Sequence, residues 1–141
     1  MGDYSKEIEV DATLDNLDTV IGFVEEALGE AGCPMKIIMK VLVSLEEVYV
    51  NVANYAYGNE LGKCWVSLDI NSTEAGGMAR IKVRDKGQAF NPMEKENPDI
   101  TLSADERPIG GLGIFMVKNI VDSIEYEYLS GENVLTMEKQ W

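Results

Sequence analysis

The sequence contains no histidine among its 141 residues, and this absence excludes several classes of chemistry. Without histidine there is no Ser-His-Asp or Cys-His nucleophile, no phosphohistidine transfer and no histidine-ligated metal. Cysteine is also scarce: Cys33 and Cys64 are far apart in the chain and form no CxxC pair, so no disulfide framework is indicated. Any catalysis must therefore use carboxylates, amides and backbone groups.

Basic residues are few, and long apolar runs are missing. Lys and Arg number 12 against 25 Asp and Glu, which gives a formal net charge of -13. Such a chain is repelled by nucleic acid and by anionic membranes. No stretch approaches the roughly 20 apolar residues that span a bilayer, and the N-terminal segment lacks a basic end followed by an apolar block. We therefore expect a cytoplasmic protein that binds neither nucleic acid directly nor a membrane.

The composition, with 45% apolar and 26% charged residues, fits one compact domain over residues 1–141. Apolar periodicity and turn residues predict these elements, in chain order: a strand over 4–11, helices over 14–31 and 35–57, strands over 64–70 and 78–84, a helix over 113–122, and strands over 123–129 and 134–139. A long irregular segment, 86–110, is typical of a lid or binding loop. The order βααββαββ predicts an α+β two-layer sandwich, in which helices cover one face of a mixed, mostly antiparallel sheet.

The second predicted helix carries a narrow polar stripe. Its members are Lys36, Lys40, Ser44, Glu47, Asn51 and Asn54. At about 100° per residue these side chains fall within roughly 80° of arc, whereas Glu46 points roughly 140° away from Asn51. A solvated stripe is the simplest interpretation. Asparagine is unfavourable in the middle of a helix, however, because its amide competes for backbone hydrogen bonds. Glu47, Asn51 and Asn54 therefore look like groups aimed into a cavity.

An apolar predicted strand runs directly into the sequence Asp85-x-Gly87-x-x-Phe90. Asp and Gly are common turn residues, and a simple turn is one interpretation. A carboxylate at a strand end inside a pocket can instead accept a hydrogen bond from an exocyclic amine such as that of adenine, and glycine permits close approach of a ligand.

A glycine cluster, Gly110, Gly111 and Gly113, opens the third predicted helix. Free backbone N–H groups and the positive end of the helix dipole make such a start suitable for phosphate, although a flexible hinge is the alternative. Neither the P-loop pattern nor the G-x-G-x-x-G spacing fits the sequence.

The three motifs together resemble the ATP-binding Bergerat fold shared by histidine kinases, gyrase-type ATPases and Hsp90. They are E-x-x-x-N on a helix, D-x-G-x-x-F at a strand end, and a lid-like loop followed by G-x-G at a helix start. Within that superfamily, the small size and a Glu where histidine kinases carry Asn are similar to the bacterial anti-sigma factor serine/threonine kinases.

The resemblance implies roles for the residues that match its helix and strand motifs. Glu47 matches the general base, Asn51 the Mg²⁺ ligand, Asp85 the carboxylate that binds adenine and Gly87 the glycine beside adenine. Asn54 has no counterpart in the motif, and we expect it only to line the pocket.

The resemblance also implies a phosphate site near the third helix. Gly111 and Gly113 match the glycines that cradle the phosphates, with Gly110 flanking them. Arg107 is a looser match to a basic residue near the terminal phosphate. The expected cofactors are ATP and Mg²⁺.

The resemblance implies a protein serine/threonine kinase that phosphorylates a STAS-type anti-anti-sigma protein, sequesters a sigma factor and forms a homodimer. The alternative is a nucleotide-binding partner-switch module without kinase activity, because no substrate-recognition motif is visible. A stand-alone ATPase resembling gyrase or Hsp90 modules is less favoured, because those proteins carry additional transducer domains and this chain has 141 residues.

Overall fold

The computed structural model describes residues 2–92 and 111–141. Its elements are β1 (Gly2–Asp11), a 3₁₀ turn (Leu14–Asn16), α1 (Leu17–Glu30), α2 (Met35–Tyr55), β2 (Lys63–Thr73), β3 (Gly76–Asp85), α3 (Gly111–Ile120), β4 (Ser123–Leu129) and β5 (Glu132–Gln140). The predicted order βααββαββ is confirmed. The 3₁₀ turn replaces the first turn of the helix that the sequence predicts from residue 14.

The five strands form one sheet in the order β1-β2-β3-β5-β4. All four pairings between these strands are antiparallel, so the sheet is not mixed. The reason is the crossover through α3: it carries the chain from β3 to the edge strand β4, and β5 then returns to fill the position between them. The strands β3 and β4, which run parallel to each other, are therefore not neighbours.

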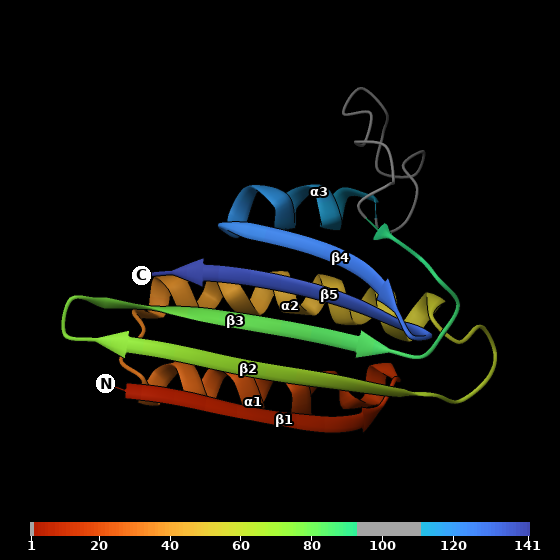
Figure 1. Ribbon diagram of the computed structural model, residues 1–141, viewed down its shortest axis with the longest axis horizontal. Coiled ribbons are helices and arrows are strands. Elements are labelled where there is room, and N and C mark those ends of the chain that lie inside the picture. The colour runs from red at the N-terminus through yellow and green to blue at the C-terminus, as the bar shows by residue number, and fades with distance from the viewer. Residues whose placement is uncertain (1, 93–110) are drawn as a thin grey trace.

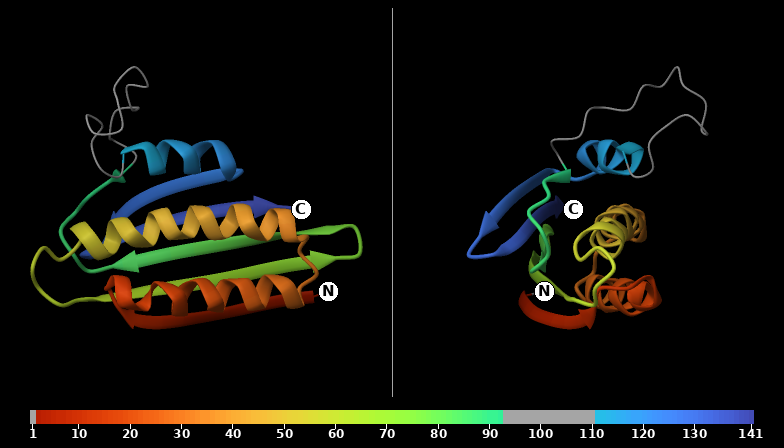
Figure 2. Two further views of the ribbon diagram at one scale, coloured as in Figure 1. Left: turned by 180° about the vertical axis from the view of Figure 1, so that it is seen from behind. Right: turned by 90° about the vertical axis from the view of Figure 1, so that its right-hand side faces the viewer.

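The helices lie on one face of the sheet, which confirms the expected two-layer α+β sandwich (Figures 1 and 2). The helix α2 packs between α1 and α3 and lies across β3 and β5 (Figure 2). Its buried side chains, Ile38, Val41, Leu42, Leu45, Val48 and Tyr49, recur at helical spacing. The Tyr49 hydroxyl also donates its one hydrogen between the carbonyl oxygens of Thr13, at 2.7 Å, and Asp11, at 3.1 Å, which joins α2 to the end of β1.

Alternation along β3 determines where the carboxylate of Asp85, a predicted site residue, lies. Ala79, Ile81 and Val83 are buried against the helices, and Asp85 continues the same alternation at the end of the strand. The carboxyl group is therefore directed to the helix-covered face rather than to solvent.

The turn between β4 and β5 determines which of the following residues belong to β5. Ser130 (φ +53°) and Gly131 (φ +81°) form a two-residue turn between β4 and β5 with the left-handed backbone that such hairpins need. The sequence prediction placed the turn over four residues, 130–133, and this was wrong, because β5 begins at Glu132. Asn133 is consequently a strand residue.

Among the described residues, no helix has both the length and the apolar character required to cross a bilayer.

Candidate functional site

A cavity lies between α2, the strands β3 and β5, and the segment that follows β3. Its described lining is mainly apolar, with four polar side chains, and comprises Val48, Asn51, Val52, Ala56, Val83, Asp85, Phe90, Pro92, Tyr126, Asn133 and Leu135. The free volume is about 30 Å³, which is enough for one or two water molecules.

Asp85 is the carboxylate of this cavity and is only 4% exposed. Its Oδ1 accepts hydrogen bonds from the Gly87 backbone N–H and from Asn133 Nδ2, both at 2.9 Å. Oδ2 has no donor within the described part of the chain. Burial raises the pKa of Asp85 above its ordinary value, and the two hydrogen bonds offset part of that rise.

Close packing against the end of α2 explains the glycine at position 87, and the sequence analysis did not foresee this contact. A Cβ at this position would lie 2.0 Å from the carbonyl oxygen of Ala56, at the end of α2. The next residue, Gln88, donates its backbone N–H to the same oxygen at 3.0 Å. The glycine therefore lets the segment after β3 pack directly on the end of α2, and its predicted place beside a base stays a prediction.

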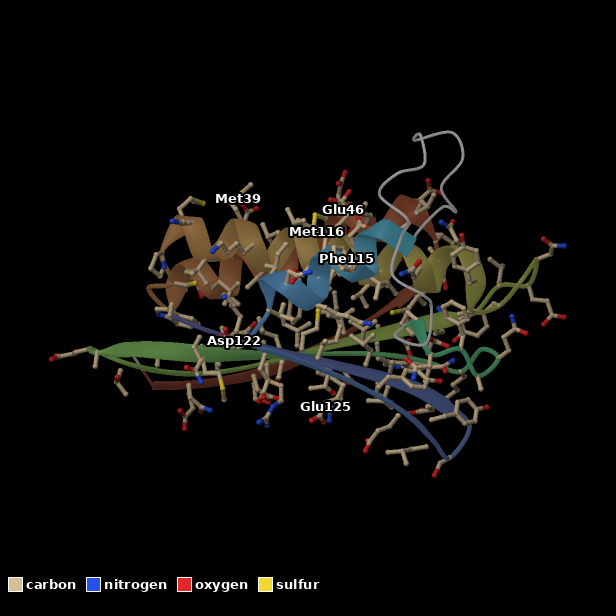
Figure 3. All side chains as sticks on the ribbon, turned by 90° about the horizontal axis from the view of Figure 1, so that it is seen from above. Met39, Glu46, Phe115, Met116, Asp122 and Glu125 are labelled. Atoms are coloured by element: carbon tan, nitrogen blue, oxygen red, sulfur yellow. The ribbon has the colours of Figure 1, made fainter. Side chains whose placement is uncertain are left out.

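Glu47 lies against the first turn of α3. A Cβ on Gly113 would lie 2.0 Å from Glu47 Oε2, so the carboxylate occupies the space that the glycine leaves open. Desolvation raises the pKa of Glu47, and the charge of the neighbouring Glu46 raises it further. Glu46 itself is exposed on the outer side of α2, away from the sheet (Figure 3). The structure thus brings Glu47, and not Glu46, to the start of α3.

Asn51 lies one helical turn after Glu47 and lines the cavity. Its side chain is 7% exposed, yet Nδ2 has no hydrogen-bond partner among the residues described. A buried polar group without a partner is destabilising by about 1–3 kcal/mol, which points to a ligand that supplies the missing contact. The amide oxygen of Asn51 is also the kind of ligand atom that Mg²⁺ prefers. The residues present therefore fit a nucleotide with its metal.

The other predicted site residues are placed less closely or not at all. Asn54 is exposed and is not among the residues that line the described cavity, so a pocket role for it stays a prediction. Gly111 is the first residue of α3, two residues earlier than the predicted helix start. Arg107 and Gly110 lie outside the described residues.

Among the polar and aromatic side chains that line the cavity, the sequence analysis did not assign Tyr126, Asn133 or the ring of Phe90 to the site. Asn133 was assigned to a turn, although in the sheet it is the direct partner of Asp85. Counting inward-facing positions back along the last strand, from Met137 through Leu135, would have identified it.

Comparison with known proteins was made on the sequence and on the fold. The model of the histidine kinase-like ATPase domain matches residues 10–139. Among solved structures, the crystal structure of the RsbU and RsbW domains of Rv1364c from Mycobacterium tuberculosis is similar, with a TM-score of 0.65 and 19% sequence identity. That match covers 96% of this chain and 32% of the other, so the chain spans about a third of its relative's length. None of the curated proteins matches the sequence.

The similarity in structure confirms the expected Bergerat-type α+β fold. The family match extends over nearly all of the sequence, from the last two residues of β1 to the residue before the end of β5, and it includes every residue named above as lining the cavity. The chain belongs to the histidine kinase-like ATPase domain family.

Proposed function

We propose that this domain is an ATP- and Mg²⁺-dependent protein serine/threonine kinase that phosphorylates a STAS-type anti-anti-sigma protein and sequesters a sigma factor. Membership of the family implies ATP binding. The observation that supports phosphoryl transfer is the position of the Glu47 carboxylate, against the first turn of α3 and one helical turn from the buried Asn51. The choice of partners rests on the resemblance to anti-sigma factor kinases.

The described residues offer partners for the base, the phosphates and the metal of the nucleotide. Asp85 Oδ2 can accept a hydrogen bond from the exocyclic amine of adenine, between apolar walls that include Val83 and Leu135. The N-terminus of α3 provides backbone N–H groups and the positive end of a helix dipole for phosphate. Asn51 would hold Mg²⁺ together with phosphate oxygens and waters. When bound, the metal neutralises phosphate charge that the acidic chain would otherwise repel.

Glu47 is the residue that can accept a proton in the transfer step. A serine or threonine hydroxyl of the partner attacks the γ-phosphorus, its proton passes to the Glu47 carboxylate, and the bond from the γ-phosphorus to the bridging oxygen breaks to release ADP. A raised pKa makes Glu47 a stronger base than an exposed glutamate. General-base catalysis of this kind contributes about 10²–10⁴-fold to a rate, and positioning and charge stabilisation supply most of the rest.

The test is transfer of label from γ-labelled ATP, with Mg²⁺, to a STAS-type protein from the same genome. We expect the wild-type chain to label that protein and Glu47→Gln to bind ADP normally while losing about 10²–10⁴-fold in transfer rate. Glu26→Gln, which removes an exposed carboxylate on α1, is the matched control and should transfer like the wild type.

Other results would change either the role of Glu47 or the function of the domain. Undiminished transfer by Glu47→Gln would remove this residue as the base. Nucleotide binding by the wild type with no transfer to any protein would favour the non-catalytic partner switch. Release of phosphate without a protein acceptor would favour a stand-alone ATPase.

Two further parts of the proposal are tested by association. A sigma factor from the same genome should co-elute with the domain in size-exclusion chromatography, and the proposed homodimer should appear in sedimentation equilibrium. Monomeric behaviour at micromolar concentration would contradict the homodimer without affecting the kinase assignment.

A further inference from the structure

Asn133 is a buried polar residue of the cavity whose side chain is fully hydrogen-bonded. It is 6% exposed and lies directly opposite Asp85 in the pairing of β3 with β5. Its Nδ2 donates to Asp85 Oδ1 at 2.9 Å and to the Gln88 carbonyl oxygen at 2.8 Å. Its Oδ1 accepts from the Phe90 backbone N–H at 3.1 Å and from the Tyr126 hydroxyl.

These contacts fix the orientation of the amide. A backbone N–H can only donate, so the Asn133 atom that faces Phe90 must be the oxygen, and the amino group must face Asp85. Rotating the amide by half a turn would leave donors facing the Phe90 N–H and an oxygen facing the Asp85 carboxylate. Buried groups left without a partner in this way are unfavourable. The amide is therefore held in one orientation.

The fixed amide in turn fixes the carboxylate of Asp85. The Asn133 amino group and the Gly87 N–H both donate to Oδ1, which leaves Oδ2 as the acceptor that Asp85 contributes to the cavity. An ionised carboxylate accepts hydrogen bonds and donates none. A site of this kind favours a ligand amine and disfavours a ligand carbonyl.

The same amide also holds one wall of the cavity. Gln88 and Phe90 belong to the segment after β3, and the Phe90 ring lies 5.9 Å, centroid to centroid, from the ring of Tyr55 at the end of α2. Tyr126, on β4, both lines the cavity and donates to the Asn133 oxygen. Asn133 is thus the single side chain, within the described residues, that joins the carboxylate, this wall and β4.

We propose that Asn133 is the positioning residue of the base site, and that by holding Asp85 it makes the site select a purine with an exocyclic amine at its 6-position over one with a carbonyl there. The proposal deepens the proposed function and rests on its nucleotide-binding part alone. Asn133 acts through Asp85 and has no part in the transfer chemistry.

The test compares the binding of ADP and inosine diphosphate by calorimetry. We expect the wild type to prefer ADP. Asn133→Ala should weaken ADP binding about 10-fold or more and inosine diphosphate binding much less, so the preference falls. Asn71→Ala, which removes an exposed amide on β2, should leave both affinities unchanged. An equal weakening of both nucleotides by Asn133→Ala would indicate a purely structural role and overturn the proposal.

A double-mutant cycle with Asp85→Asn tests whether Asn133 acts through the carboxylate. In the Asp85→Asn background, Asn133→Ala should change the preference no further, and an additive change would contradict the proposal. Tyr126→Phe keeps the fold while it removes one of the two donors to the Asn133 oxygen, and should lose part of the preference. If Asn133→Ala fails to fold, an unchanged preference in Tyr126→Phe overturns the proposal.

The result for the wild type separates this proposal from the kinase assignment. A wild-type chain that binds both nucleotides equally overturns the role of Asn133 alone, whereas one that binds neither overturns the nucleotide-binding part of the proposed function and the role of Asn133 with it. A wild-type chain that prefers ADP but transfers no phosphate counts only against the kinase activity.

Discussion

At the residue scale, the buried charge of Asp85 opposes folding, while the proposed function requires it for binding the base. Burial raises the pKa of this carboxyl in the folded state above the ordinary value of 3.8. As pH rises through 3.8, the unfolded chain therefore ionises first, and the free energy of unfolding falls until the folded carboxyl has also ionised. At higher pH the carboxyl is ionised in both states, and its burial lowers the free energy of unfolding by a constant amount.

Asp85→Asn should therefore stabilise the domain at neutral pH while impairing nucleotide binding. The asparagine oxygen can keep both hydrogen bonds that Oδ1 accepts, and the buried charge is gone. Its amino group would face the amine of the base, donor against donor, and we expect ADP binding to weaken about 10- to 100-fold. Urea unfolding between pH 4 and 7 and calorimetry with ADP measure the two effects. A variant less stable than the wild type at pH 7 would contradict this account.

At the element scale, two glycines make close contacts between elements, and their neighbours differ in kind. At Gly113 the nearest atom to an added Cβ is the end of the flexible Glu47 side chain, whereas at Gly87 it is the backbone carbonyl of Ala56. A side-chain end can move aside, but a helix backbone cannot. The same substitution should therefore affect function at one position and stability at the other.

Gly113→Ala should leave the fold intact and lower phosphoryl transfer. Alanine favours the α3 helix over glycine by about 0.5–1 kcal/mol, so the free energy of unfolding should not fall. The Glu47 carboxylate must move from its place against α3, and a displacement of about 1 Å lowers a catalysed rate on the order of 10²-fold. Urea unfolding and the label-transfer assay, run side by side, measure the two quantities. Transfer at the wild-type rate would contradict the placement of Glu47.

Gly87→Ala should destabilise the domain. The added methyl group would overlap the Ala56 carbonyl, and overpacking of this kind lowers the free energy of unfolding by about 1–3 kcal/mol. The midpoint of urea unfolding measures the change, with Gly29→Ala as control because an added Cβ meets nothing within 4 Å at that position. Gly29 lies within α1, where alanine is favoured over glycine, so the control should not lower the midpoint. A midpoint for Gly87→Ala as high as that of the wild type would show that the segment after β3 can shift away from α2.

The sequence pattern was sufficient to predict the helices and strands, but it predicted only part of the candidate site. Helical and alternating periodicity identified the three α-helices and five strands described, because apolar side chains recur along each of them at the spacing of its type. Asn51 was identified because an amide in the middle of a helix is unusual. Asn133 was not, because the predicted turn removed it from the last strand; its inward-facing position follows from alternation, but its place opposite Asp85 follows from the pairing of β5 with β3, which depends on the crossover through α3. The packing of Gly87 on Ala56 depends on tertiary structure in the same way.

At the scale of the whole molecule, the excess of negative charge is unevenly compensated. On the open face of the sheet, Arg80 pairs with Glu138, and Arg84 pairs with both Glu7 and Glu132. These partly exposed pairs contribute little to stability, about 0–1 kcal/mol each. The α1 helix has only acidic charges, including Glu26 and Glu30 four residues apart in its last turns. Acidic side chains there repel one another and the negative end of the helix dipole.

Glu30→Lys should therefore stabilise the domain, and the gain should depend on salt. Replacing an exposed acid in the last turn of α1 with a base reduces the net charge of -13 by two units and reverses the interaction with the dipole, for which about 0.3–1 kcal/mol is typical at low ionic strength. Screening weakens both effects at higher salt. Urea unfolding in low and high NaCl should show a larger difference between variant and wild type in low salt, and the wild type itself should gain stability as salt is added. A wild type that loses stability on adding salt would mean that the ion pairs of the open sheet face outweigh the repulsion of the whole chain.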